Sequence, residues 1–161
     1  MENRNATVAV IGAGDNIGAA IATRFAAEGF TVFAGRRHGD KLAPLVADVE
    51  ARGGQIVARS LDARKEDDLT AFLQEADRRA PLEVCIFNVG ANVNFPLIET
   101  TERVFRKVWE MACYAGFLAG REAASTSRTS SSMPGWTPPG FASGSGKARG
   151  TPPSQGSLPA G

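Results

Sequence analysis

The sequence contains little cysteine, histidine and tyrosine. Among 161 residues there are two cysteines, one histidine and one tyrosine. Cys85 and Cys113 are too far apart for a C-x-x-C site and too few for a disulfide framework, so we expect two small buried thiols in a reducing cytoplasm. His38 has no set of cysteines or carboxylates at ligand spacing around it, and we therefore expect no metal site.

Long apolar runs are absent as well. No stretch approaches the ~20 uninterrupted apolar residues that a membrane-spanning helix requires, and the N-terminus lacks the apolar core of a signal peptide. The formal net charge is +1, which gives no electrostatic reason for binding to nucleic acid or to an anionic membrane. We therefore expect neither as a partner.

Acidic residues are missing from the last part of the chain. Residues 1–124 hold all 17 Asp and Glu residues and a single serine, Ser60, whereas residues 125–161 hold nine serines and six prolines. Ser, Thr, Pro and Gly make up 26 of these last 37 residues. With only four bulky apolar residues, this segment cannot offset an ordering cost of ~1–2 kcal/mol per residue. We predict a partial globular domain over residues 1–124 and a disordered tail over residues 125–161.

Residues 1–124 alternate between strand and helix patterns. Short apolar, β-rich runs predict strands, and apolar residues at helical spacing, closed by Gly or Pro, predict helices. Four repeats of this alternation are typical of stacked βαβ units, so we predict an α/β fold with a Rossmann-like, doubly wound parallel sheet of about four strands. The predicted strands are 7–11, 31–34, 55–61 and 82–87, and the predicted helices are 17–28, 40–50, 65–79 and about 101–124.

A glycine-rich turn follows the first predicted strand and opens the first predicted helix. A pyrophosphate needs close approach to a backbone without Cβ atoms, and free N–H groups and the helix dipole stabilise its charge. The position of the turn within a βαβ unit favours dinucleotide binding, and a tight turn without a ligand is the alternative. The candidate residues of this turn are Gly12, Gly14, Asp15, Asn16, Ile17 and Gly18.

The end of the second predicted strand carries Arg36 and Arg37. In dinucleotide-binding folds a carboxylate at this place binds the ribose hydroxyls of NAD, whereas arginine suits the 2′-phosphate of NADP. We therefore predict NADP as the cofactor, with NAD less favoured, and two solvated arginines are the alternative. Asp15 opposes this assignment, because its negative charge in the glycine-rich turn adds repulsion near the phosphates.

Over about residues 6–124 the chain resembles the short-chain dehydrogenase/reductase family. The cofactor turn of that family reads T-G-x-x-x-G-x-G. Residues 11–18 follow its frame, but Ile11 replaces the threonine and Asn16 the middle glycine, and we expect Gly14 to restore some of the lost backbone freedom. The resemblance implies an NAD(P)-dependent oxidoreductase that transfers hydride to or from a carbonyl or alcohol group of a small-molecule substrate.

The resemblance also implies roles for residues outside the turn. Asp62 would accept a hydrogen bond from the adenine amino group, and Ala63 would pack beside it. Asn88 and Gly90 belong to a segment similar to the N-N-A-G motif of the family, which supports the sheet and lines the cofactor cleft. The predicted helix over residues 102–124 resembles one that often packs across a subunit interface, which implies a homo-oligomer.

The catalytic residues of the family have no counterpart in the sequence. Family chemistry uses a tyrosine hydroxyl that exchanges a proton with the substrate oxygen, a lysine four residues later that lowers the pKa of that tyrosine, and a serine that polarises the substrate. Tyr114 is the only tyrosine, and Leu118 follows it by four residues. Cys113 stands where a supporting asparagine would be. We therefore predict no catalytic residue in this chain.

Three functions remain open. The chain is an oxidoreductase by ancestry that lacks its catalytic half, a non-catalytic module that binds NADP or a partner, or a non-functional truncated product. We expect the outer face of the first strand and the long helix to be uncovered, which would leave an apolar patch and an unpaired edge. The abrupt change in composition after Ala124 leads to the hypothesis that a G+C-rich gene is translated in a shifted frame from there.

Overall fold

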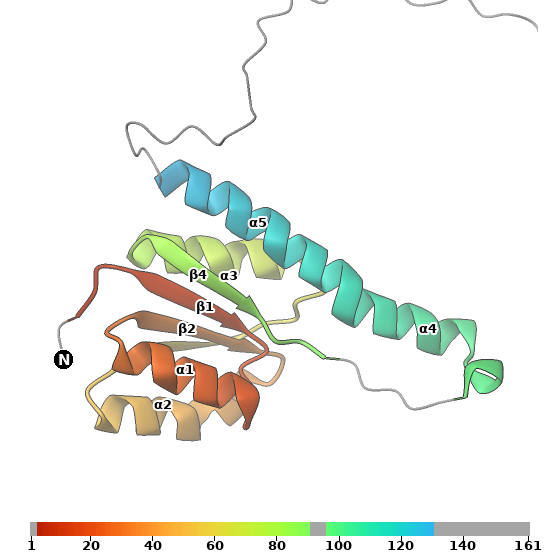
Figure 1. Cartoon of the computed structure of the whole chain (residues 1–161), viewed down its shortest axis with the longest axis horizontal. Coiled ribbons are helices and arrows are strands. Elements are labelled where there is room, and N and C mark those ends of the chain that lie inside the picture. Colours follow the sequence, from red (N-terminus) through yellow and green to blue (C-terminus); the bar gives the residue numbers. More distant parts are fainter. Residues whose placement is uncertain (1–2, 91–95, 131–161) are drawn as a thin grey trace, which may run out of the picture.

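A four-stranded parallel sheet forms the centre of the computed structural model, which describes residues 3–90 and 96–130, the last four by their backbone only (Figure 1). The strand order is β3-β2-β1-β4, and every neighbouring pair is parallel. The predicted α/β fold with a doubly wound sheet is confirmed. The strands are β1 (Thr7–Ile11), β2 (Thr31–Arg36), β3 (Gln55–Ser60) and β4 (Leu82–Phe87).

Helices cover both faces of the sheet, because successive side chains of a strand point to opposite faces. Val8 and Val10 of β1 belong to one buried cluster, and Ala9 and Ile11 belong to the other. The first face packs against α1 (Ile17–Ala27) and α2 (Ala43–Ala51), and the second against α3 (Glu66–Arg79) and α5 (Ala115–Ser130) (Figure 1). Shorter helices are η1 (Gly39–Leu42), η2 (Leu97–Glu99), α4 (Glu102–Trp109) and the π-helical turn η3 (Glu110–Tyr114).

The first strand is the best-covered element of the sheet. β1 pairs with β2 on one side and β4 on the other, and all five of its residues are buried. The expectation that the outer face of the first strand lies uncovered is therefore wrong. Among the described residues, the strands with one unpaired edge are β3 and β4, and residues 84–87 of β4 are accordingly only partly buried.

The second predicted helix begins later than its sequence pattern indicates. Asp40, the expected cap, lies inside η1, and α2 begins at Ala43 with Pro44 in its first turn. A proline is accommodated in the first turn of a helix because its missing N–H would have no intrahelical partner there. The single 3₁₀ turn before it brings the chain round from β2 to the helix.

The long fourth helix is interrupted by a π-helical turn. η3 separates α4 from α5, and the predicted apolar stripe is buried only over α5: Ala115 and Ala119 are buried, whereas Phe105 is 63% exposed. α4 extends beyond the carboxyl ends of the strands, away from the sheet (Figure 1). The long helix is thus covered over α5 and exposed over α4.

The last helix also runs further than predicted. α5 continues to Ser130, so residues 125–130 are helical and the helix passes the domain boundary expected at residue 125. Thr126 is only 7% exposed, and no Gly or Pro occurs between Arg121 and Ser130. Extending an existing helix needs one residue fixed per added hydrogen bond, whereas starting one is costly. The remainder of the predicted disordered tail, residues 131–161, lies outside the described residues.

Candidate functional site

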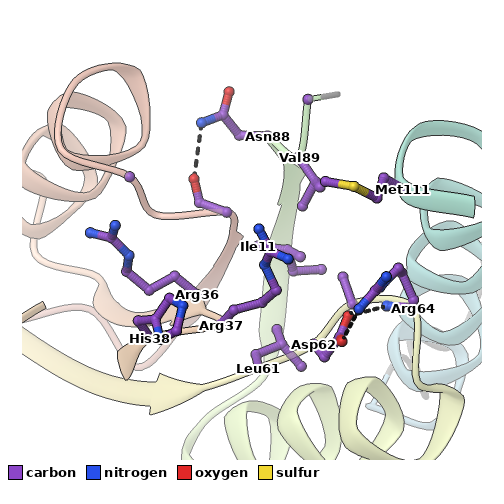
Figure 2. Close-up of a pocket in the computed structure, with 14 residues that line it drawn as sticks. Ile11, Arg36, Arg37, His38, Leu61, Asp62, Arg64, Asn88, Val89 and Met111 are labelled. Carbon is purple, nitrogen blue, oxygen red and sulfur yellow. Dashed lines mark hydrogen bonds and ion pairs between the residues drawn. The ribbon is translucent and has the colours of Figure 1, made fainter. Parts of the chain in front are cut away.

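A pocket of about 230 Å³ opens at the carboxyl ends of the strands, where ligands bind in open α/β sheets (Figure 2). Its volume is below the ~300–1,000 Å³ of a typical small-molecule site, so the residues described here enclose only part of a dinucleotide-sized site. The lining residues are Ile11, Gly12, Gly14, Arg36, Arg37, His38, Leu61, Asp62, Ala63, Arg64, Asn88, Val89, Gly90 and Met111.

Gly12 begins the glycine-rich turn in a conformation that requires glycine. Its φ is +86°, and a Cβ atom there would lie 2.6 Å from the Asn88 carbonyl oxygen. The side-chain Nδ2 group of Asn88 donates to the Gly12 carbonyl oxygen at 3.0 Å, as drawn in Figure 2. The backbone N–H of Asn88 donates to the Ile11 carbonyl oxygen at 2.8 Å. A Cβ on Gly18 would lie 2.5 Å from the Gly12 oxygen. The turn is therefore packed between β4 and the start of α1.

The two other variable positions of the turn do not depend on left-handed backbone. Asn16, in place of the middle glycine, has φ of −109°, so its side chain is accommodated. Gly14 is not among the glycines with positive φ, and a Cβ there would approach only the Gly12 oxygen, at 4.0 Å. The expectation that Gly14 compensates for the missing glycine is wrong, because no compensation is needed.

The start of α1 presents free hydrogen-bond donors. Within residues 3–90 and 96–130, the amides of residues 15–18 donate to no backbone oxygen, and the Asn16 side chain does not cap the helix. Uncapped amides at a helix N-terminus carry a partial positive charge and suit a phosphate group. The backbone at this turn fits the pyrophosphate of a dinucleotide.

Arg36 forms an ion pair across the turn. Its Nη1 atom lies 2.7 Å from Asp15 Oδ1. The contact follows from the register of the sheet, since Ile11 of β1 pairs with Gly35 of β2, and the residues beyond each strand end are then neighbours. Arg37 and His38, the next residues along the chain, are exposed and line the pocket.

Asp62 is held by Arg64. Asp62 Oδ1 accepts from the Arg64 amide at 3.2 Å and from Nε at 2.9 Å, and Oδ2 accepts from Nη2 at 2.6 Å. The Arg64 side-chain hydrogen bonds are the main reason that the pKa of Asp62 falls to about 2 from its ordinary 3.8, and the charge of Arg37 contributes a smaller part. Asp62 is therefore an ionised acceptor at neutral pH.

The structure brings eight of the twelve predicted cofactor residues to this pocket. The other four belong to the glycine-rich turn: Asp15 and Asn16 line a neighbouring crevice, Ile17 is 67% exposed, and Gly18 packs against Gly12. Six lining residues were not among the predicted ones: Ile11, His38, Leu61, Arg64, Val89 and Met111. His38 and Arg64 directly follow predicted ligands, which is a usable signal, whereas Met111 reaches the pocket through the η3 turn, which no sequence pattern indicated. The eight are Gly12, Gly14, Arg36, Arg37, Asp62, Ala63, Asn88 and Gly90.

The side chains weighed for catalysis serve the packing of the helices. The Tyr114 ring stacks on Trp109, with centroids 5.8 Å apart and planes at 18°, and Leu118 is 1% exposed in the core. Cys113 is exposed, which corrects the expectation of two buried thiols. Cys85 is half-buried, and this burial raises the pKa of its thiol to about 11.

Among the described residues no cluster of potential metal ligands occurs, and none of their helices is long and apolar enough to span a bilayer.

A parallel sheet of this order, with a glycine-rich turn between its first strand and first helix, defines a Rossmann-type dinucleotide-binding domain. The chain belongs to the short-chain dehydrogenase family, a family of NAD(P)-dependent oxidoreductases, whose model matches residues 6–131. It is similar to the crystal structure of a short-chain dehydrogenase from Rhodopseudomonas palustris, with 78% identity and a TM-score of 0.75 over 76% of this chain and 58% of that one.

Curated relatives share lower identity. The chain is 36% identical over 89 residues to the ketoacyl reductase HetN of Nostoc sp., covering 55% of this chain and 31% of that protein. It is 32% identical over 116 residues to the hydroxynaphthalene reductase-like protein Arp2 of Metarhizium robertsii, covering 71% of this chain and 43% of that protein. The chain thus spans less than half the length of these curated relatives.

Replacing Gly12 by alanine should destabilise the domain. The change Gly12→Ala forces a side chain into left-handed backbone and against the Asn88 carbonyl, so we expect the free energy of unfolding to fall by about 2–4 kcal/mol. Gly14→Ala is the matched control and should cost less than ~1 kcal/mol, because a Cβ there meets no close atom. Chemical denaturation measures both, and equal losses would contradict the assigned role of Gly12.

Acid should weaken the contribution of Asp62 to stability. Because its native pKa lies below its unfolded value, the contribution is complete above about pH 4 and is lost as the pH falls towards 2. We expect the difference in unfolding free energy between the wild type and Asp62→Asn to shrink by about 1–2 kcal/mol across that window. Denaturant titrations from pH 5 to pH 2 measure this, and a constant difference would exclude the Asp62–Arg64 pair as its source.

Proposed function

We propose that this chain binds NADP(H) at the pocket between the glycine-rich turn and the ends of β2, β3 and β4, and that it does not carry out hydride transfer on its own. The observation that carries this proposal is the combination of free amides at the start of α1 with arginines at the end of β2. Bound NADPH would supply the hydride in the chemistry of the family, acting on a carbonyl substrate.

Each part of the dinucleotide has a candidate contact. The amides of residues 15–18 suit the pyrophosphate. Asp62 is an ionised acceptor for the adenine amino group, with Ala63 beside it. Asn88 holds the glycine-rich turn in place through its hydrogen bond to the Gly12 carbonyl oxygen. Arg36 and Arg37 supply positive charge where NAD-binding folds place a carboxylate. Positive charge at this point favours a ligand that carries the additional 2′-phosphate.

The residues around Tyr114 support the proposed absence of catalysis. The ring stacks on Trp109 in the η3 turn, and the residue four positions later is the buried Leu118 where the family chemistry requires a lysine ammonium group. The tyrosine–lysine spacing that the family uses for proton exchange is therefore missing at Tyr114. Tyr114 therefore holds the helix packing and does not exchange a proton with a substrate, and the chain acts as a reductase only if the missing groups come from elsewhere.

Cofactor titration tests this proposal. We expect the purified chain to bind NADPH at least about fivefold more tightly than NADH, as measured by calorimetry or nicotinamide fluorescence. Arg37→Gln should reduce that ratio about two- to fivefold, and the control Arg52→Gln, on an exposed arginine paired with Asp48, should leave it unchanged. Equal affinities would contradict the NADP preference, and robust turnover of ketones or aldehydes would contradict the absence of catalysis. A chain that binds neither cofactor and does not melt cooperatively favours a non-functional product.

A second function, self-association through α4, has a specific observation in its favour. Phe105 is 63% exposed and Trp109 is 48% exposed, and residues four apart lie on one face of a helix. Large exposed aromatic side chains are typical of protein interfaces. We propose that a second copy of this chain covers this face.

Sedimentation at several concentrations tests self-association. We expect a reversible dimer in the micromolar range, and Phe105→Ser should weaken it about tenfold or more, because aromatic anchors dominate interface energies. Leu97→Ser is the matched control, since Leu97 is also highly exposed, at 89%, but lies outside α4. A wild-type chain that remains monomeric at all concentrations would rule this function out.

A further inference from the structure

Asp15 lies directly beside one of the two arginines that would recognise the 2′-phosphate. Its carboxylate contacts the Arg36 guanidinium at 2.7 Å. The side chain of Asp15 is 79% exposed, whereas that of Arg36 is 20% exposed. Arg36 is thus the anchored partner, fixed at the end of β2, and Asp15 is the solvated one.

The guanidinium groups around the pocket are not equally available. Arg64 is engaged by both oxygens of Asp62, and Arg36 by Asp15. Arg37 has no hydrogen bond or ion pair to the described part of the chain, although its charge reaches Asp62. Figure 2 shows the Arg36 and Arg37 side chains pointing apart, with Arg36 directed towards the turn that precedes α1. A phosphate on the ribose therefore meets one available arginine and one that already holds an anion.

We propose that Asp15 is a specificity-determining residue: its carboxylate competes with the 2′-phosphate for Arg36 and thereby limits the preference for NADP over NAD. The inference rests on the proposed binding of NADP(H). A phosphate can reach Arg36 only by displacing Asp15 or by binding within its repulsive field, and NAD has no group that needs Arg36. The exposed pair is weak, so it opens readily and the effect is a moderate change in affinity.

The test measures how well each variant distinguishes the two cofactors. Asp15→Asn removes the charge and keeps the size of the side chain. Because both cofactors carry the pyrophosphate, both can bind more tightly, and we expect the gain for NADPH to exceed the gain for NADH about three- to tenfold. Asp48→Asn is the matched control, because Asp48 lines the same crevice as Asp15 but pairs with Arg52. It should change neither affinity by more than about twofold.

A double-substitution cycle shows whether Asp15 acts through Arg36. In an Arg36→Gln background, Asp15→Asn should no longer raise the NADPH-to-NADH affinity ratio by more than about twofold. If Asp15→Asn leaves the NADPH-to-NADH ratio unchanged or lowers it, or if its effect persists without Arg36, the competition does not exist. A wild type that binds neither cofactor overturns the proposed function, and the inference with it, whereas binding without a response to Asp15→Asn overturns the inference alone.

Discussion

The contact between Gly12 and Asn88 holds the candidate site together. β1 and β4 are the two strands between which the order of the sheet reverses, and the chain leaves β1 in a left-handed conformation that places Gly12 directly against the Asn88 carbonyl. The Asn88 side chain then binds the Gly12 oxygen, and Gly18 closes on that oxygen from the other side. Two glycines and one amide thus position the start of α1, and the orientation of its free amides follows from this packing.

The second determinant of the site is its distribution of charge. Arginines, rather than acids, stand at the end of β2, but the chain places a carboxylate against two of the three guanidinium groups near the pocket. Positive charge at the pocket is therefore concentrated without a large net excess. A site built in this way recognises an additional phosphate through competition among local ion pairs and not through a strong overall field.

Much of the fold was predictable from local patterns, because the strands are short β-rich runs and the covering helices α1, α2 and α3 each have an apolar face closed by Gly or Pro. Gly12 was predictable because a phosphate-binding turn needs backbone without a Cβ. The Asp15–Arg36 pair depends on the register of β1 against β2, and the partner of Asp62 depends on how the chain turns after β3, so neither contact follows from residue types alone. The π turn at Glu110–Tyr114 has no sequence signature in a single chain, and Met111 within it lines the pocket.

The passage of α5 through the change in composition has a practical consequence. The chemical character of the sequence changes after Ala124, but the helix and its packing against α3 continue, with Thr126 buried beyond that point. A boundary drawn from amino-acid usage would cut through the final turns of a core helix and leave its last carbonyl groups without partners. Anyone shortening this protein for crystallisation should therefore keep the chain at least to Ser130.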